Sequence, residues 1–129
     1  MTAPHLRAGR RAEQIAGRWL RRQGLQQISS NYRCKAGELD LIMLERNCLV
    51  VVEVRYRRGQ SYGGALNSVS HAKRQRIATT TMHYLQAHPR FKHHALRFDI
   101  ITLTGPVNDP VIEWHRRAFD ADGLQTSHS

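Results

Sequence analysis

Lysine is the scarcest charged residue in this sequence. Only Lys35, Lys73 and Lys92 occur, although Lys and Arg together number 20 against 10 Asp and Glu, giving a formal charge of +10. The positive charge is therefore almost all arginine, whose planar guanidinium binds two phosphate oxygens at once. An excess of this size favours polyanionic partners, meaning nucleic acid or an anionic membrane surface.

Cysteine and long apolar runs are also scarce. Cys34 and Cys48 form no CxxC pattern, and the eight histidines are not spaced as zinc ligands. Two reduced thiols are typical of a cytoplasmic protein. No stretch approaches the length of about 18 apolar residues that a membrane-spanning helix needs, and the N-terminus lacks the apolar core of a signal peptide. We therefore expect a cytoplasmic protein with no membrane segment.

Residues 37 to 57, GELDLIMLERNCLVVVEVRYR, predict a β-hairpin at the centre of the fold. Apolar residues alternate with period two in both halves, and the polar interruption ERNC predicts the turn. Leu39, Leu41 and Met43 are expected on one face of the first strand. The valines at 50, 52 and 54 are expected to share one face of the second strand.

This hairpin pairs residues whose numbers sum to 93, so Asp40 would face Glu53, and Glu38 would face Arg55. Opposed Cβ atoms lie roughly 4.5–5.5 Å apart, and like charges at that distance repel. A divalent cation such as Mg²⁺ or Mn²⁺ between Asp40 and Glu53 would relieve the repulsion. The alternative is a solvated pair of acids that arginines at 33, 55 or 57 neutralise.

Two amphipathic helices are predicted, over residues 4–23 and from about Ser70 to His88. Ser70 is a credible N-cap. The buried stripe of the first helix contains Ala12, Ile15, Ala16, Trp19 and Leu20, and that of the second contains Ile77, Ala78, Thr81, Tyr84 and Leu85.

The same helices carry cationic faces. These are either ordinary solvated surfaces or phosphate-binding surfaces, and the candidate nucleic-acid contacts are Arg7, Arg10, Arg11, Arg18, Lys73, Arg74 and Arg76. Glu13 lies among the arginines of the first helix, at the border of its buried stripe. It either pairs with an arginine or leans towards Asp40 and Glu53.

Three further strands are predicted, over residues 25–33, 96–104 and 111–114. Asp99 is expected to form a buried ion pair with Arg97 or a helix-1 arginine rather than to bind metal, and Ala118 and Phe119 are expected to dock as a cap. The element order predicts one α/β domain, residues 1–121, in which helices flank a mixed sheet. Residues 122–129 are expected to form a disordered tail.

Taken together, AGRRAEQIAGRWLRRQG, GELDLI, VVVEVRYRR, SHAKRQRIA and LRFDIITLTG resemble the YraN family of uncharacterised bacterial proteins, over about residues 8–119. That family is placed in the restriction-endonuclease-like superfamily, close to the Holliday-junction resolvases, and its αβββαβ core matches the predicted element order. The resemblance implies that Asp40 and Glu53 hold Mg²⁺ or Mn²⁺. It further implies the Val54 carbonyl as another ligand, Glu13 as an assisting acid and Glu38 as a supporting group behind the ligands.

Arg55 departs from the superfamily, which has its catalytic lysine at that position. Arginine donates hydrogen bonds and stabilises charge, but its pKa, above about 12, prevents it from acting as a base. Metal-bound hydroxide would serve without a lysine, or Lys35 or Lys73 would replace it, or catalysis has been lost.

The leading hypothesis is a Mg²⁺- or Mn²⁺-dependent DNA endonuclease in which Arg55 contacts the scissile phosphate. Binding would be independent of sequence, and the resemblance implies branched DNA and pairing as a homodimer. The rivals are a catalytically silent nucleic-acid-binding module with the same basic surface and an interaction protein whose charge keeps it soluble.

Overall fold

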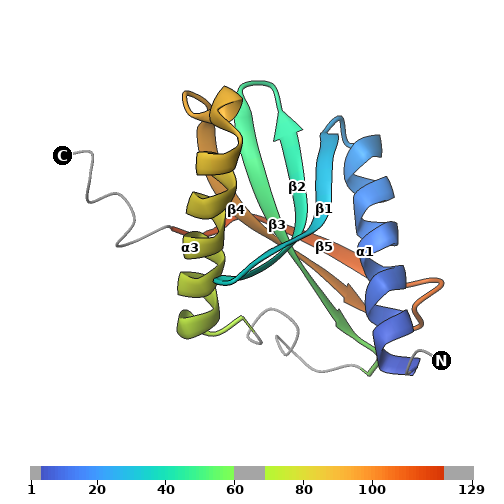
Figure 1. Ribbon diagram of the computed structural model, residues 1–129. Helices are drawn as coiled ribbons and strands as arrows, with labels where there is room; N and C mark the ends of the chain where they lie inside the picture. Colours follow the sequence, from blue (N-terminus) through green and yellow to red (C-terminus); the bar gives the residue numbers. More distant parts are fainter. Residues whose placement is uncertain (1–3, 60–68, 121–129) are drawn as a thin grey trace.

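The computed structural model describes residues 4–59 and 69–120, with side chains from residue 8 onward. Two helices flank a five-stranded sheet (Figure 1). The elements in order are α1 (Pro4–Arg22), β1 (Gln26–Cys34), β2 (Gly37–Glu45), β3 (Cys48–Arg57), α3 (His71–Ala87), a short 3₁₀ turn η1 (Pro89–Phe91), β4 (Ala95–Thr104) and β5 (Val111–Phe119). This confirms the predicted α/β fold and its αβββαβ core. The predicted disordered tail, 122–129, lies outside the described residues.

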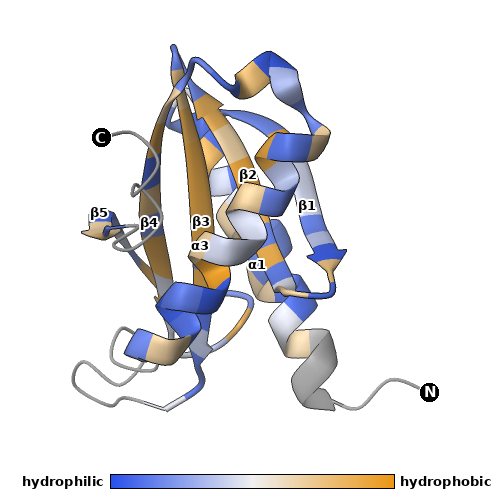
Figure 2. Cartoon of the chain, turned by 60° about the vertical axis from the view of Figure 1, so that its left-hand side comes forward, coloured by the Kyte–Doolittle hydropathy of each residue, from blue (hydrophilic) through white to orange (hydrophobic). Residues whose placement is uncertain are grey.

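The strands lie in the order β1-β2-β3-β4-β5. β3 and β4 are parallel, because the chain between them crosses the sheet through α3, and the other neighbouring strands pair antiparallel. α1 and α3 lie on opposite sides of the sheet in Figure 1. The central strands β3 and β4 are hydrophobic along most of their length, whereas β1 is mostly hydrophilic (Figure 2).

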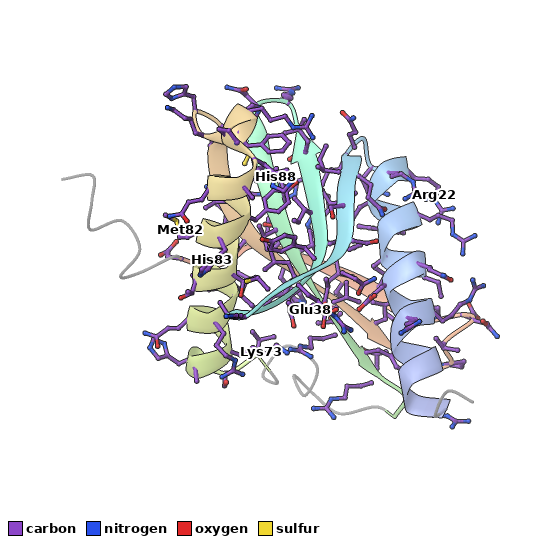
Figure 3. All side chains as sticks on the ribbon, viewed as in Figure 1. Arg22, Glu38, Lys73, Met82, His83 and His88 are labelled. Carbon is purple, nitrogen blue, oxygen red and sulfur yellow. The ribbon has the colours of Figure 1, made fainter. Side chains whose placement is uncertain are left out.

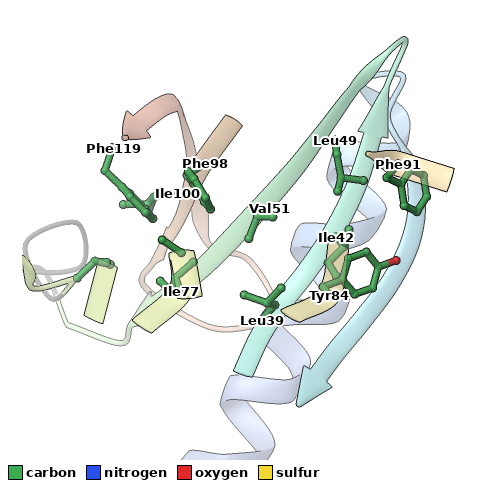
Figure 4. Close-up of a cluster of buried hydrophobic side chains, with 12 residues drawn as sticks. Leu39, Ile42, Leu49, Val51, Ile77, Tyr84, Phe91, Phe98, Ile100 and Phe119 are labelled. Carbon is green, nitrogen blue, oxygen red and sulfur yellow. The ribbon is translucent and has the colours of Figure 1, made fainter. Parts of the chain in front are cut away.

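Each face of the sheet has its own apolar core. On the α3 side, Ile42, Val51, Ile77, Tyr84, Phe98 and Ile100 pack together, as Figure 4 shows. On the α1 side the core contains Ala12, Ala16, Leu20, Leu41, Met43, Val50, Val52, Val54, Ile101 and Leu103. The predicted stripes of both helices and the shared face of the three alternate valines are thus confirmed.

One predicted face is wrong. Leu39 packs on the α3 side, while Leu41 and Met43 pack on the α1 side. The alternation breaks at Asp40, and Asn31, between the β1 residues that pair with Leu39 and Leu41, adopts a positive φ of 55°. Asparagine tolerates this conformation better than most residues do.

The hairpin register is as predicted from Glu45–Cys48 to Leu41–Val52, and the pairing of β2 with β3 stops there. Beyond that point β3 stays paired with β4 as far as Arg57–Thr104. Glu38 does not pair with Arg55, contrary to the prediction. It lies opposite Arg33 of β1, at 3.5 Å from Nε to Oε2. β2 and β3 therefore separate at Asp40.

Asp99 is fully buried on β4 and forms the predicted ion pair with Arg97, at 3.1 Å. It also accepts hydrogen bonds from Trp114 Nε1 at 2.9 Å and from the Arg117 backbone N–H at 3.0 Å. The last of these bonds holds the backbone at Arg117, where φ is 51°, and β5 continues to Phe119. The prediction that β5 ends at residue 114 was therefore wrong, whereas Ala118 and Phe119 do dock on the α3-side core, as the end of this strand.

Candidate active site

A cavity of about 690 Å³ opens where β2 and β3 separate. Helix α1 contributes Ala8, Gly9, Ala12 and Glu13 to its lining, the strands contribute Asp40, Glu53, Val54, Arg55 and Tyr56, and Arg58 and Lys73 complete it. Every charged residue that sequence reasoning assigned to catalysis therefore lies on this one cavity.

Asp40 takes over part of the interrupted strand pairing. Its Oδ2 accepts a hydrogen bond from the Val54 N–H at 2.9 Å. Burial raises the pKa of Asp40 above its usual range, and the bond from Val54 opposes that rise. The carboxylate is held rigidly by the backbone of the neighbouring strand, with Oδ2 engaged.

Glu53 is almost completely buried, with 4% of its surface exposed. Its Oε2 lies 2.5 Å from Arg55 Nη2 and 3.3 Å from Lys73 Nζ. Burial, and then the charge of Asp40, raise the pKa of Glu53 to about 7, against the opposing effects of Arg55 and Lys73. Two cations therefore do not fully compensate the negative charge that these acids bring into the cavity.

Lys73 comes from α3, on the far side of the sheet from α1. Ser70 caps this helix as predicted, because its side chain accepts the Lys73 backbone N–H at 3.2 Å. The cap fixes the first turn of α3 and so aims Lys73 at the end of the sheet (Figure 3). Of the two lysines considered as replacements, Lys73 reaches Glu53, while Lys35 is exposed beyond β1 and does not line the cavity.

Arg55 lines the cavity and lies against Glu53. Its Nη2 is 2.5 Å from Glu53 Oε2, while its Nε is buried without a hydrogen-bond partner among the described residues. A buried, unpaired donor is costly. Both nitrogens are covered by neighbouring atoms, so an anionic oxygen entering the cavity would reach them only after a shift of the side chain.

Glu13 projects from α1 into the same cavity. Burial, followed by the charge of Asp40, raises its pKa to about 7, and a hydrogen bond from the Asn31 side chain opposes this. The structure thus brings Glu13, Asp40 and Glu53 together. Glu38 stays at the margin beside Arg33, although its charge also raises the pKa of Glu13.

The donor set fits a divalent ion held by two carboxylates. In the described part of the chain, no three His, Cys, Asp or Glu side chains gather closely enough to form a metal cluster. Mg²⁺ commonly takes one or two carboxylates and completes its shell with water and phosphate oxygens. Asp40 and Glu53 meet that requirement, and burial, which raises the pKa of both, makes their charged forms costly unless a cation balances them.

The residues predicted to contact nucleic acid lie in several parts of the structure. Lys73 lines the cavity, and Arg10 and Arg18 line a second cleft beside it. Arg11 donates to Asn108 at 3.4 Å, and Arg74 donates to the Val69 carbonyl at 3.0 Å while lying over the Phe119 ring. Arg76 is exposed on α3, and the side chain of Arg7 falls outside the described residues.

Sequence reasoning missed two arginines of the second cleft, Arg21 and Arg33. The first had a signal, because Gln14, Arg18 and Arg21 follow helical spacing on one face of α1. No sequence pattern pointed to Arg33, because its place in the cleft depends on where β1 lies against α1.

The sequence matches the model of an uncharacterised protein family, UPF0102, over residues 12–103. The chain belongs to this family. A UPF0102 protein of Pseudomonas syringae pv. syringae is 44% identical over 115 residues, which cover 88% of this chain and 94% of the relative. One from Stutzerimonas stutzeri is 42% identical over 114 residues, covering 88% and 95%, and one from Alcanivorax borkumensis is 42% identical over 112 residues, covering 86% and 90%.

The predicted resemblance to the YraN family, which is UPF0102, is therefore confirmed. The family description assigns no activity to its members. Within the described residues, neither helix combines the length and the apolar character needed to cross a membrane.

Proposed function

We propose that this UPF0102 protein is a nuclease that uses Mg²⁺ or Mn²⁺ to cleave the phosphodiester backbone of DNA. One observation carries the proposal. Asp40 of β2, Glu53 of β3 and Lys73 of α3 come from three elements and meet in one cavity where two strands separate. Two acids that can hold a divalent ion, with a lysine beside them, are groups that metal-assisted phosphodiester hydrolysis can use.

Asp40 and Glu53 would hold the ion, with the Val54 carbonyl as a further ligand and Glu13 supporting them from α1. The bound ion would supply a water of lowered pKa and would neutralise phosphate charge. Asp40 is already oriented for this role by its bond from Val54. Glu53 contacts both Arg55 and Lys73 through Oε2.

Lys73 and Arg55 divide the role that one lysine plays in the superfamily. Lys73 lies against Glu53, where an amine holds or donates a proton next to the reacting water. Arg55 lines the cavity, and its guanidinium would turn from Glu53 to contact a scissile phosphate there. With arginine in place of the superfamily lysine at position 55, the cavity would therefore still have a group for proton transfer, Lys73, and a group for phosphate binding, Arg55.

The substrate of this proposal is DNA bound through its phosphates. No feature described here reads a base edge, so binding would be independent of sequence. Branched DNA follows from the superfamily resemblance alone. The setting we propose is the cytoplasm, and Cys34 and Cys48 are both free thiols, as expected in a reducing compartment.

A catalytically silent DNA-binding module is the second candidate, and one observation favours it. Arg55 and Lys73 already surround Glu53, so two cations offset part of the acid charge without any metal. The basic surface would then bind DNA while the acids serve only as structure.

A cleavage assay separates the two. Wild type is incubated with linear, flapped and four-way DNA in Mg²⁺ or Mn²⁺, and Asp40→Asn is compared with Glu113→Gln, an exposed acid on β5. Metal-dependent cleavage that Asp40→Asn abolishes and Glu113→Gln retains supports the nuclease. DNA binding without cleavage of any substrate favours the module.

A further inference from the structure

A second cleft, of about 820 Å³, runs between α1 and the edge strand β1. Its lining is almost entirely polar, and consists of Arg10, Glu13, Gln14, Arg18, Arg21, Gln27, Ser30, Asn31, Arg33 and Leu41. The cleft is not part of the site described above. It touches that site at one residue, Glu13, which lines both hollows.

The cleft is strongly cationic. Its lining contains four arginines and a single acid, Glu13. Among the described residues, neither Arg10 nor Arg18 forms an ion pair, and Arg33 has only a long contact with Glu38, its own side chain being 71% exposed. This charge is therefore available to an anionic ligand.

The chemistry of the lining favours phosphate over base. No aromatic side chain lines the cleft, so it offers no stacking platform for a nucleobase. Guanidinium and amide groups donate to phosphate and sugar oxygens instead. A volume of about 820 Å³ accommodates a short stretch of one backbone inside the cleft, whereas a duplex would rest across its mouth.

We propose that this cleft binds the phosphates of one unpaired nucleic-acid strand as it leaves the catalytic cavity. The inference rests on the proposed function for its direction and deepens it, because it assigns the nuclease a substrate with a single-stranded arm. Glu13 marks the junction, where the strand passes from Arg55 and the metal ligands to the arginines of α1 and β1.

The test is a binding measurement that needs no catalysis. Fluorescence anisotropy in EDTA compares a short single-stranded DNA, the same sequence as RNA, and a blunt duplex. The variants are Arg18→Glu and Arg33→Glu, with Arg22→Glu as matched control. Arg22 lies one turn beyond Arg18 on α1, points away from the sheet in Figure 3 and lines neither hollow.

We expect each cleft variant to weaken single-strand binding about tenfold or more and to reduce the salt slope by about 0.7 per lost contact. Arg22→Glu should change it less than about twofold. Equal losses in all three variants, or duplex binding as tight as single-strand binding, would overturn the proposal. Tighter binding of RNA than of DNA would overturn DNA as the ligand of this cleft.

The outcomes for the two proposals are distinct. If the arginine pattern holds but no substrate is cleaved with metal, the nuclease fails and the strand-binding cleft stands. If flapped and linear DNA are cleaved equally and Arg18→Glu binds like wild type, the nuclease stands and the cleft proposal fails. Thermal melting of each variant checks that the fold is retained.

Discussion

Lys73 on α3 places its Nζ 3.3 Å from Oε2 of Glu53 on β3. The contact joins a helix on one face of the sheet to a carboxylate at the point where β2 and β3 separate. In sequence these residues are far apart, and only the crossover from β3 to β4 through α3 brings them together. The first prediction follows from this pair.

Lys73→Met should abolish metal-dependent cleavage while leaving DNA affinity within about twofold, because one exposed phosphate contact at most is lost. Lys73→Arg keeps a positive charge beside Glu53, so the acid limb of the pH–rate profile should stay in place while the rate falls, because a guanidinium does not release a proton. Cleavage rates across pH, with Lys92→Met as the surface control, provide the measurement. Full activity in Lys73→Met would contradict the assignment.

Arg55→Lys restores the residue that the superfamily carries at this position, so any nuclease activity should persist or rise. Arg55→Met should lose it, because the cavity then keeps no donor from this position for the scissile phosphate. Single-turnover cleavage of the preferred substrate compares the three proteins. If Arg55→Lys is inactive while wild type is active, the two-pronged guanidinium has a role that an ammonium does not fill.

A divalent ion should stabilise the fold. Binding at a hundredfold excess over Kd contributes about 2.7 kcal/mol, which corresponds to a rise of several degrees in Tm for a domain of this size. Differential scanning fluorimetry with Mn²⁺ should show the shift in wild type and in Glu113→Gln. It should be absent from a variant that combines Asp40→Asn with Glu53→Gln. If millimolar Mn²⁺ does not change the wild-type Tm, Asp40 and Glu53 do not hold a metal, and their only charged partners among the described residues are Arg55 and Lys73.

Stability should fall as Glu13 ionises. Its pKa is about 7 in the folded protein against 4.5 as the reference value, so the folded state binds the proton more tightly. The stability that this proton contributes is complete below pH 4.5 and is lost as pH rises through about 7. Glu13→Gln, which mimics the protonated acid, should therefore melt close to wild type at pH 4.5 and above it at pH 8, both in EDTA. If the difference in Tm between Glu13→Gln and wild type is the same at both pH values, burial of Glu13 is not raising its pKa.

The buried pair of Asp99 and Arg97 should be essential for folding. Asp99→Asn removes the charge that Arg97 faces, and breaking a buried pair costs about 3–5 kcal/mol. Urea denaturation should show a loss of this order, whereas Asp109→Asn, an exposed acid near β5, should change stability by less than about 0.5 kcal/mol. A loss below about 1 kcal/mol would mean that solvent reaches the pair.

The sequence predicted the fold well, because the hydrophobic periods are unambiguous. Alternate valines fixed the faces of β3, and the polar ERNC turn fixed the register of the hairpin. Asp40 could be assigned to the site for the same reason. The break in alternation at Asp40 could not be foreseen, because the apolar pattern of β2 continues through it unchanged.

The open points of the site have the same origin. Sequence reasoning named both Lys35 and Lys73 as replacements for the superfamily lysine, and the contact of Lys73 with Glu53 depends on how α3 packs against the sheet. The position of Arg33 beside α1, which sequence reasoning missed, likewise depends on how separate elements pack. The length of β5 depended on one hydrogen bond, from Arg117 to Asp99, across the sheet.

Both edges of the sheet carry an irregularity. On β1 the register shifts between Gln27 and Ser29, and Asn31 adopts a positive φ; on β5 the register against β4 shifts and Arg117 adopts a positive φ. An edge strand that is bent in this way is a poor template for a further strand, and so resists the edge-to-edge pairing that leads to aggregation. Two copies of this chain would then be expected to associate through side-chain surfaces and not by joining their sheets into one.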